Sequence, residues 1–90
     1  MTVRHNVAQS RYELDADHGL AVAVYREHGD RAIFTHTEVP PADGGKGVAT
    51  RLVREALDDV RRRGLKIVPA CSFVVAFVQR HPEYDDARRP

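Results

Sequence analysis

The stretch that decides the fold is TEVPPADGGKGVA, which runs from Thr37 to Ala49. It reads as the end of a β-strand, two prolines that cannot donate to a β-ladder, a glycine-rich turn and the start of a helix. The first turn of a helix leaves backbone N–H groups without partners, and the helix dipole is positive there. The turn is therefore a candidate site for phosphate oxygens. An ordinary strand-to-helix turn, in which the glycines only relieve strain, also explains the motif by itself.

Three strand-like segments precede this turn, with the approximate bounds Arg11–Asp15, Leu20–Arg26 and Arg31–Val39. Their side chains alternate between two faces, as in a β-sheet with one buried side. Short connections that contain glycine join the segments, which is typical of hairpins. Sequential strands joined in this way predict an antiparallel meander.

The segments after the turn predict a crossover. An amphipathic helix from about Lys46 to Arg63 ends at Gly64, and a short buried strand follows at Leu65–Val68. A second helix is expected at Phe73–Arg80, with Ser72 as its N-cap. The predicted order is β-β-β-α-β-α. This order indicates an α/β (α+β) fold in which a meander is followed by a parallel β-α-β crossover, with helices packed on a mixed sheet.

Composition limits the function classes. The chain has 90 residues, which is enough for one domain spanning 1–90. Its net charge of +1 gives no support for a nucleic-acid-binding face, and its single cysteine, Cys71, cannot form an intramolecular disulfide. The sequence lacks an apolar run of the ~20 residues needed to span a membrane, and residues 1–10 contain no apolar segment typical of a signal peptide, so we expect none. We expect a soluble cytoplasmic protein without a metal site.

The glycine turn lacks the Walker spacing, and no third glycine follows to complete a Rossmann fingerprint. The meander, the Val-Pro-Pro and GGKGVA stretches, the amphipathic helix and the short strand together resemble the GNAT superfamily of acetyl-CoA-dependent N-acyltransferases. The stretches THTEVP (35–40), PACSFV (69–74) and RHPEY (80–84) resemble its small single-domain members. The resemblance extends from about Tyr12 to Tyr84. It departs at Ala42, where the superfamily signature has Arg or Gln.

The resemblance implies acetyl-CoA as the cosubstrate. Its pyrophosphate would bind backbone amides of the glycine turn. Its pantetheine arm would lie between the strand that ends at Val39 and the strand at Leu65–Val68, paired with backbone groups like an added strand. The acetyl group would then lie near Pro69–Ser72. The residues expected to bind the cosubstrate are Glu38, Val39, Asp43, Gly44, Gly45, Lys46, Gly47 and Val48.

Two residues are candidates for catalysis. Cys71 precedes a predicted helix, whose N-terminus lowers a thiol pKa, and a thiolate could act as nucleophile or base. The small members that the chain resembles carry cysteine there, although a cysteine that only packs is the alternative. Strict alternation puts His36 on one strand face with Phe34 and Glu38, where it could accept the proton of an ammonium or simply pack. In many GNAT enzymes a tyrosine protonates the departing CoA thiolate, a role open to Tyr84.

The resemblance predicts an acetyl-CoA-dependent N-acetyltransferase that moves an acetyl group to a primary amine. The amine could belong to a small molecule or to a protein. Two alternatives remain: a CoA-binding or regulatory module without turnover, and a protein-interaction domain without any cofactor.

Overall fold

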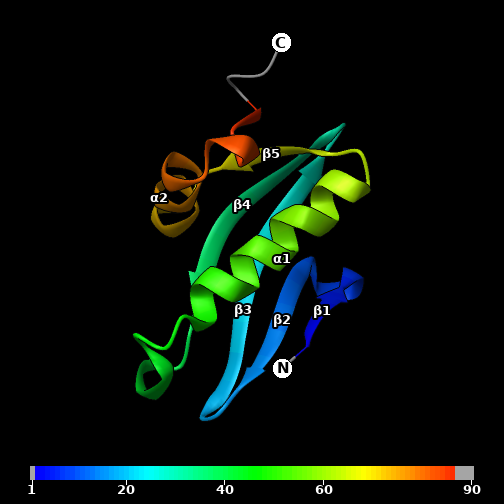
Figure 1. Cartoon of the computed structure of the whole chain (residues 1–90). Helices are drawn as coiled ribbons and strands as arrows, with labels where there is room; N and C mark the ends of the chain where they lie inside the picture. Colours follow the sequence, from blue (N-terminus) through cyan, green and yellow to red (C-terminus); the bar gives the residue numbers. More distant parts are fainter. Residues whose placement is uncertain (1, 87–90) are drawn as a thin grey trace.

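The computed structural model describes residues 2–86, and its core is one mixed sheet with helices packed against it (Figure 1). The strands lie side by side in chain order; the first four are antiparallel, and the fifth runs parallel to the fourth. The main elements are β1 (Val3–Asn6), β2 (Arg11–Ala16), β3 (Gly19–His28), β4 (Arg31–Glu38), α1 (Val48–Arg62), β5 (Lys66–Pro69) and α2 (Ser72–Arg80). The predicted meander, crossover and fold class are confirmed.

α1 buries one apolar stripe against the sheet. The buried residues follow the i, i+3, i+4 spacing of a helix face and are Val48, Leu52, Val53, Ala56, Leu57 and Val60. They belong to the same core cluster as inward-facing strand residues such as Tyr12, Ala23 and Phe34, none of which is more than 1% exposed. Each fully buried Leu or Val side chain stabilises the fold by about 1.5–3 kcal/mol. The stripe therefore holds the N-terminus of α1 at the same end of the molecule as the β2–β3 turn (Figure 1).

α2 packs beside α1 at the edge formed by β4 and β5. Its buried residues include Phe77, whose ring lies beneath the guanidinium of Arg54 on α1 at 5.5 Å. The 3-10 turn after α2 contains Tyr84, which is buried and packs on Phe77 with ring centroids 5.5 Å apart. The Tyr84 hydroxyl donates a hydrogen bond of 2.6 Å to Asp58 on α1. The segment after β5 is thus tied to α1 rather than free in solution.

The N-terminal strand β1 was not predicted, so the observed order is β-β-β-β-α-β-α. Its sequence, Val3-Arg4-His5-Asn6, has a single aliphatic residue and gives no strand signal. β1 is held instead by side chains of its neighbour β2. The His5 ring stacks on Tyr12 with centroids 4.2 Å apart and an interplanar angle of 7°.

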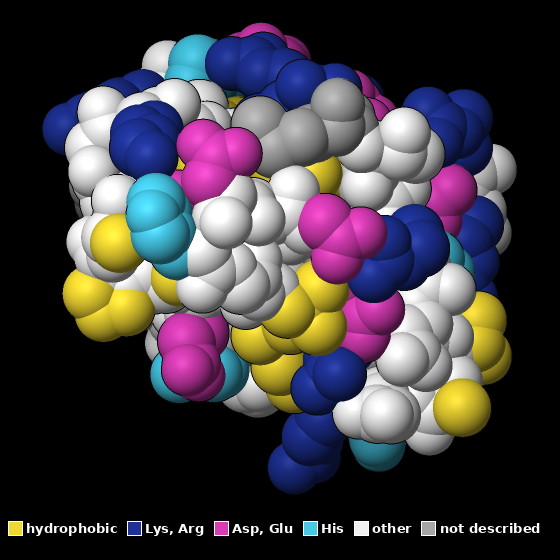
Figure 2. Space-filling model, turned by 90° about the horizontal axis from the view of Figure 1, so that it is seen from below, with side chains coloured by type: hydrophobic (Ala, Val, Ile, Leu, Met, Phe, Trp, Pro, Cys, Tyr) yellow, Lys and Arg dark blue, Asp and Glu magenta, His cyan; other side chains and the backbone are white. Residues whose placement is uncertain are grey.

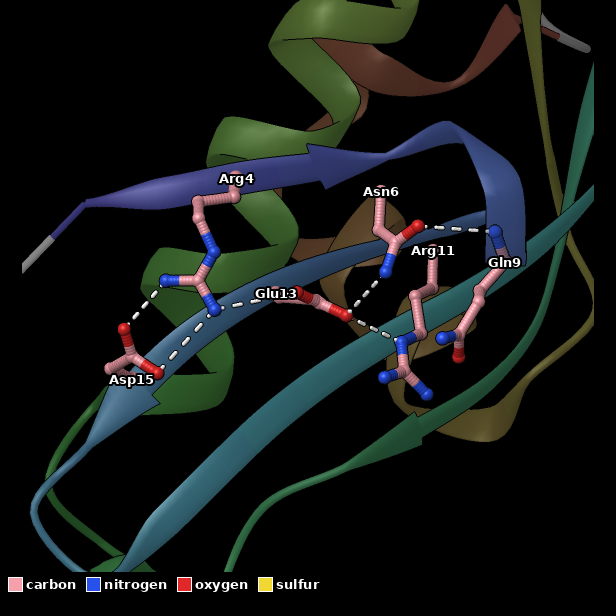
Figure 3. Close-up of polar contacts among 6 residues, drawn as sticks. All are labelled: Arg4, Asn6, Gln9, Arg11, Glu13 and Asp15. Atoms are coloured by element: carbon pink, nitrogen blue, oxygen red, sulfur yellow. Dashed lines mark hydrogen bonds and ion pairs between the residues drawn. The ribbon is translucent and has the colours of Figure 1, made fainter.

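A charged network on the opposite face of the same strands also holds β1 (Figure 3). Glu13 on β2 accepts hydrogen bonds from Asn6 at 2.9 Å, Arg11 at 2.7 Å and Arg4 at 3.3 Å. These hydrogen bonds, the one from Asn6 foremost, lower the pKa of the Glu13 carboxyl, although burial opposes them. Arg4 also pairs with Asp15. The network clamps β1 to β2 and compensates the charge of a carboxylate that is almost completely buried.

A β-bulge in β4 changes which residues face the core. The register with β3 shifts by one residue, because Val24 lies opposite His36 whereas Tyr25 lies opposite Phe34. Thr35 is the extra residue, and an extra residue reverses the alternation of side chains beyond it. Thr37 therefore joins the helix-covered face that holds Phe34, and the prediction that His36 shares the face of Phe34 is wrong.

Other bounds differ from the predicted ones by a few residues. α1 begins at Val48 rather than Lys46, because Gly47 at its N-cap is left-handed with φ of +77°. Cys71, not Ser72, occupies the N-cap position of α2. β5 begins at Lys66, one residue later than expected. Within residues 2–86 no helix is both long enough and apolar enough to cross a membrane.

Candidate functional site

The candidate site begins where β4 and β5 part. The two strands pair from Arg31 with Lys66 to Phe34 with Pro69. The Phe34 carbonyl then accepts the N–H groups of both Ala70 at 3.0 Å and Cys71 at 2.9 Å. β4 continues to Glu38, and within residues 2–86 this continuation pairs with β3 alone. The backbone edge of β4 beside the start of α2 is consequently not covered by a neighbouring strand.

A hollow of about 260 Å³ lies at this end of the molecule, and we call it the loop hollow. It brings together the end of β4, the glycine turn and the first turns of α1 and α2. Figure 2 views the molecule from this end, with apolar side chains near the middle of the face and charged ones of both signs around them. The residues that line the loop hollow are Val39, Asp43, Gly44, Gly45, Gly47, Val48, Ala49, Thr50 and Phe73.

Six of the eight residues predicted to bind the cosubstrate line the loop hollow; Glu38 and Lys46 do not. The N–H groups of Asp43 and Gly44 are already bonded, to the carbonyls of Pro40 at 2.9 Å and Pro41 at 3.2 Å. The amides available to an anion therefore start at Gly45. This restricts the predicted backbone donors to Gly45 and the residues that follow it, up to the first turn of α1.

Backbone conformation explains the glycines at this turn. Gly45 has φ of +79° and Gly47 has φ of +77°, which L-residues with side chains rarely adopt. A Cβ atom at either position would meet nothing within 4 Å. A side chain there would thus strain the backbone and project from the surface of the turn, without colliding with the rest of the protein.

The side chain of Asp43 is turned into the protein and is 1% exposed. It accepts hydrogen bonds from the His18 backbone N–H at 2.9 Å, and it contacts the His18 ring Nδ1 at 3.0 Å and the Lys46 ammonium at 3.2 Å. The hydrogen bond to the His18 side chain is the largest cause that lowers the pKa of Asp43 to about 2. Lys46 also lies 3.5 Å from Asp17. The ammonium of Lys46 is therefore already paired with two carboxylates.

Cys71 lies where the acetyl group was expected, at the N-cap of α2 and half-buried. Its Sγ is 3.4 Å from the Thr37 hydroxyl. Burial raises the pKa of the thiol, but hydrogen bonds from Thr37 and from the N–H groups of Val74 and Phe73 outweigh burial and lower it overall. A lowered pKa increases the fraction of reactive thiolate near neutral pH.

His36 and Glu38 lie on the other face of β4 and pair with each other, with His36 Nε2 3.1 Å from Glu38 Oε2. Their side chains are 58% and 69% exposed. The β4 side chain that contacts the Cys71 thiol is that of Thr37, a contact that sequence reasoning missed. Predicting this contact would have required knowledge of the β-bulge at Thr35. The alternation of side chains in the sequence does not indicate a bulge.

A second hollow, of about 350 Å³, lies between β1 and α1, and we call it the β1 hollow. Its carboxylates are engaged within the chain. Asp58 accepts the Tyr84 hydroxyl at 2.6 Å, Asp59 accepts the Tyr12 hydroxyl at 2.6 Å, and Glu55 accepts Arg51 Nε at 2.9 Å. The lining residues are Val3, His5, Tyr12, Glu55, Asp58, Asp59 and Arg62. The hydrogen bond from the Tyr84 hydroxyl to Asp58 ties the turn after α2 to α1, which gives Tyr84 a structural role.

A family profile described as GCN5-related N-acetyl-transferase matches residues 11–87. The chain belongs to the GCN5-related N-acetyltransferase (GNAT) family. The NMR solution structure of a GCN5-like protein from Staphylococcus aureus matches this GNAT chain with a TM-score of 0.72 and 25% identity, and covers 94% of this chain and 84% of the other. Acyl transfer is thus the general activity that family membership supports.

Curated relatives of this GNAT chain carry the name Protein NATD1. The bovine and human proteins are each 36% identical to it over 75 residues, which is 82% of this chain and 66% of theirs. The zebrafish protein is 32% identical over 89 residues, 93% of this chain and 81% of its own length. The chain thus spans about two thirds of the bovine and human relatives. Within residues 2–86 no group of three or more His, Cys, Asp or Glu side chains is placed to hold a metal ion.

Proposed function

We propose that this protein transfers an acetyl group from acetyl-CoA to a primary amine, with Cys71 next to the acetyl group. One observation carries the proposal: the loop hollow extends from the glycine turn to Phe73 in the first turn of α2, and Cys71, whose thiol pKa is lowered, is the N-cap of the same helix. Amides that can donate to phosphate oxygens on one side, and a thiol two residues before Phe73 on the other, suit the pyrophosphate and the thioester of acetyl-CoA.

The pyrophosphate is assigned to the backbone N–H groups from Gly45 to Val48. These amides stand at the positive end of the α1 dipole, and oriented amides of this kind bind phosphate oxygens. Lys46 already pairs with Asp43 and Asp17, so it adds positive potential rather than a free donor. Binding would then depend on backbone amides, in a chain that has Ala42 where the family signature has Arg or Gln.

The pantetheine arm is assigned to the uncovered edge of β4. Its amide groups can pair with backbone groups near Glu38 and Val39 as an added strand would. Val39 lines the loop hollow, and Phe73 faces it from α2. The backbone of Glu38, rather than its exposed carboxylate, is the part suited to this contact.

The chemistry assigned to Cys71 is nucleophilic. Its thiolate would attack the thioester carbonyl, the C–S bond to CoA would break, and the CoA thiolate would leave with a proton from solvent. An unprotonated amine would then attack the acetyl-cysteine, release the Cys71 thiolate and lose one proton to water. Thr37 and the N–H groups of Phe73 and Val74 would stabilise the thiolate between these steps. His36 lies on the other face of β4, so its predicted role as proton acceptor would require a relay through solvent.

A CoA-binding module without turnover is the second candidate, and one observation favours it. The two side chains expected to move protons, His36 and Tyr84, are respectively on the far face of β4 and bonded to Asp58. Such a module would bind acetyl-CoA but would not hand the acetyl group to an amine.

Two measurements test what the proposal requires first, which is acetyl-CoA binding and an acetyl adduct on Cys71. Acetyl-CoA at ~100 times its dissociation constant should stabilise the fold by about 2.7 kcal/mol, a rise in Tm on the order of 10 °C for a domain of this size. No rise in Tm with millimolar acetyl-CoA would remove both CoA-dependent functions and favour an interaction domain.

Intact mass analysis after incubation with acetyl-CoA tests the nucleophile. An acetyl adduct should form on the wild-type protein and should be absent from Cys71→Ala. An adduct that forms equally in Cys71→Ala would remove Cys71 from this role.

Free CoA release in a screen of amines tests turnover itself. Release that requires both an amine and Cys71 supports the transferase. Binding without release for any small amine or lysine-containing peptide supports the module.

A further inference from the structure

We propose that Asp43 and His18 are positioning residues for the glycine turn, and that their contact holds residues 44–48 in the form that binds the CoA pyrophosphate. This inference rests on the proposed function. It adds a link between the β2–β3 turn and cosubstrate affinity, carried by residues that do not themselves need to touch the ligand.

The contact joins two segments that are far apart in the sequence. His18 lies in the β2–β3 turn, just before β3, and Asp43 ends the short 3-10 turn that leads into the glycines. The same carboxylate receives the backbone N–H of His18 through one oxygen and faces the ring Nδ1 through the other, at 2.9 and 3.0 Å. A carboxylate that is 1% exposed is costly to bury without such partners, so the contact defines where this end of the loop lies.

The carboxylate also reaches into the loop itself. Lys46 Nζ is 3.2 Å from Asp43, so the same group binds the turn on one side and the middle of the glycine stretch on the other. Packing supports this arrangement, because a Cβ on Gly19 would lie only 3.2 Å from the Pro40 side chain. The β2–β3 turn and the start of the loop thus touch at two independent points.

The contact depends on pH. The charged groups that the described residues bring to this corner are Asp43 and Lys46 from the loop and Asp17 and His18 from the turn. The hydrogen bond to Asp43 raises the pKa of the His18 ring above its ordinary value. The ionic part of the contact is therefore complete below about pH 6.5 and is lost as the pH rises through the raised pKa of the folded state. The hydrogen bond from the His18 backbone N–H does not depend on the charge of the ring.

Calorimetric titration with CoA tests the link. Asp43→Asn should weaken CoA binding about tenfold, the loss that corresponds to one charge-assisted hydrogen bond. His18→Ala should weaken it by a smaller factor. His18→Asn keeps a neutral side-chain donor and should retain most of the affinity, while losing the part of the pH dependence that His18 supplies. CoA itself titrates, so the informative quantity is the difference between wild type and His18→Asn across pH 5.5 to 8.5, a range of about three units around the imidazole pKa.

Two controls test whether the effect is specific to the contact between His18 and Asp43. His28→Ala changes a histidine at the end of β3, beside the other hairpin turn, and should leave CoA affinity and its pH dependence unchanged. At saturating acetyl-CoA, the rate of Cys71 acetylation should be the same in His18→Ala and wild type, because the contact affects binding and not the thiol.

The proposal is overturned if Asp43→Asn and His18→Ala, both folded, bind CoA as tightly as the wild type. If Asp43→Asn does not fold, His18→Ala decides alone, because the His18 side chain is 56% exposed and its loss leaves the core intact. A wild type that does not bind CoA contradicts the proposed function itself. That outcome is distinct from tight wild-type binding without any effect of these variants.

Discussion

The loop hollow and the β1 hollow differ in the polar groups that they leave available to a ligand. The β1 hollow is the larger, and its polar lining consists of side chains already bonded to one another, such as Asp59 with Tyr12 and Asp58 with Tyr84. The loop hollow is smaller, and its polar groups include backbone amides of the glycine turn at a helix N-terminus. Size alone would favour the β1 hollow. The groups that remain available for a ligand are the reason that we propose the loop hollow as the binding site.

The largest effect is expected from a side chain at the glycine turn. Gly47→Val should weaken CoA binding about 100-fold, because a β-branched residue at φ of +77° strains the turn and displaces its amides. Gly29→Val is the matched control, since Gly29 is also left-handed with open space around it but lies in the β3–β4 turn. It should strain the protein without changing CoA affinity.

Lys46→Ala tests the same assignment from the side-chain side. The Lys46 ammonium is already paired with Asp43 and Asp17, so it should contribute less to CoA affinity than the backbone amides do. A decrease in CoA affinity of about threefold or less is expected, the size of a screened surface charge effect. If Lys46→Ala binds CoA more weakly than Gly47→Val, the assignment of the pyrophosphate to backbone amides is wrong.

An effect on reactivity rather than on binding is expected at the thiol. Thr37→Val keeps the shape of the side chain but removes the hydrogen bond to Cys71, so the thiol pKa should rise. Because a tenfold loss of thiolate corresponds to one pKa unit, reaction with iodoacetamide at neutral pH should slow by up to about tenfold. CoA affinity should hardly change. An unchanged rate of alkylation would show that the hydroxyl does not stabilise the thiolate.

The β1 side of the molecule should respond in stability and not in binding. Glu13→Gln should lower the free energy of unfolding by about 2 kcal/mol at neutral pH, because it weakens charge-assisted hydrogen bonds to the buried carboxylate. The folded-state pKa of Glu13 is lowered, so its contribution is present above the unfolded pKa and is lost as the pH falls through the folded one. Urea unfolding at several pH values checks this. A variant whose stability differs from wild type equally at every pH would contradict it.

The smaller of the two effects on stability is expected from the lining of the β1 hollow. Tyr12→Phe removes the hydroxyl that donates to Asp59 and should cost about 1 kcal/mol of unfolding free energy, since Asp59 keeps a contact with Arg62. CoA affinity should be unchanged. A clear loss of CoA affinity in this variant would mean that the β1 hollow takes part in binding and that the two hollows were distinguished wrongly.

The glycine turn, the crossover and the stripe of α1 could be predicted because they depend on local rules. Pro40 and Pro41 end a strand, Gly64 ends a helix, and buried residues repeat with the helical period. The position of Cys71 at the start of α2 followed from the same kind of signal. Local rules could not indicate a ligand, and acetyl-CoA was proposed from the family resemblance.

The rest depends on contacts that are distant in the sequence. β1 is held by the stacking of His5 on Tyr12 and by the network around Glu13. No pattern in residues 3–6 indicates these contacts. The bulge at Thr35 moved His36 to the other face and brought Thr37 to Cys71. The alternation of side chains in the sequence does not show where a bulge inserts an extra residue. One extra residue moves every following side chain of the strand to the opposite face.

The central claim is that CoA binds at the loop hollow and not at the β1 hollow. The most direct measurement is a titration of the isotope-labelled protein with CoA, followed by the chemical shifts of its backbone amides. The account predicts the largest changes at Gly45, Gly47 and Phe73, with the amides of His5 and Asp59 unmoved. Changes centred on the β1 hollow, or none with millimolar CoA, would contradict it.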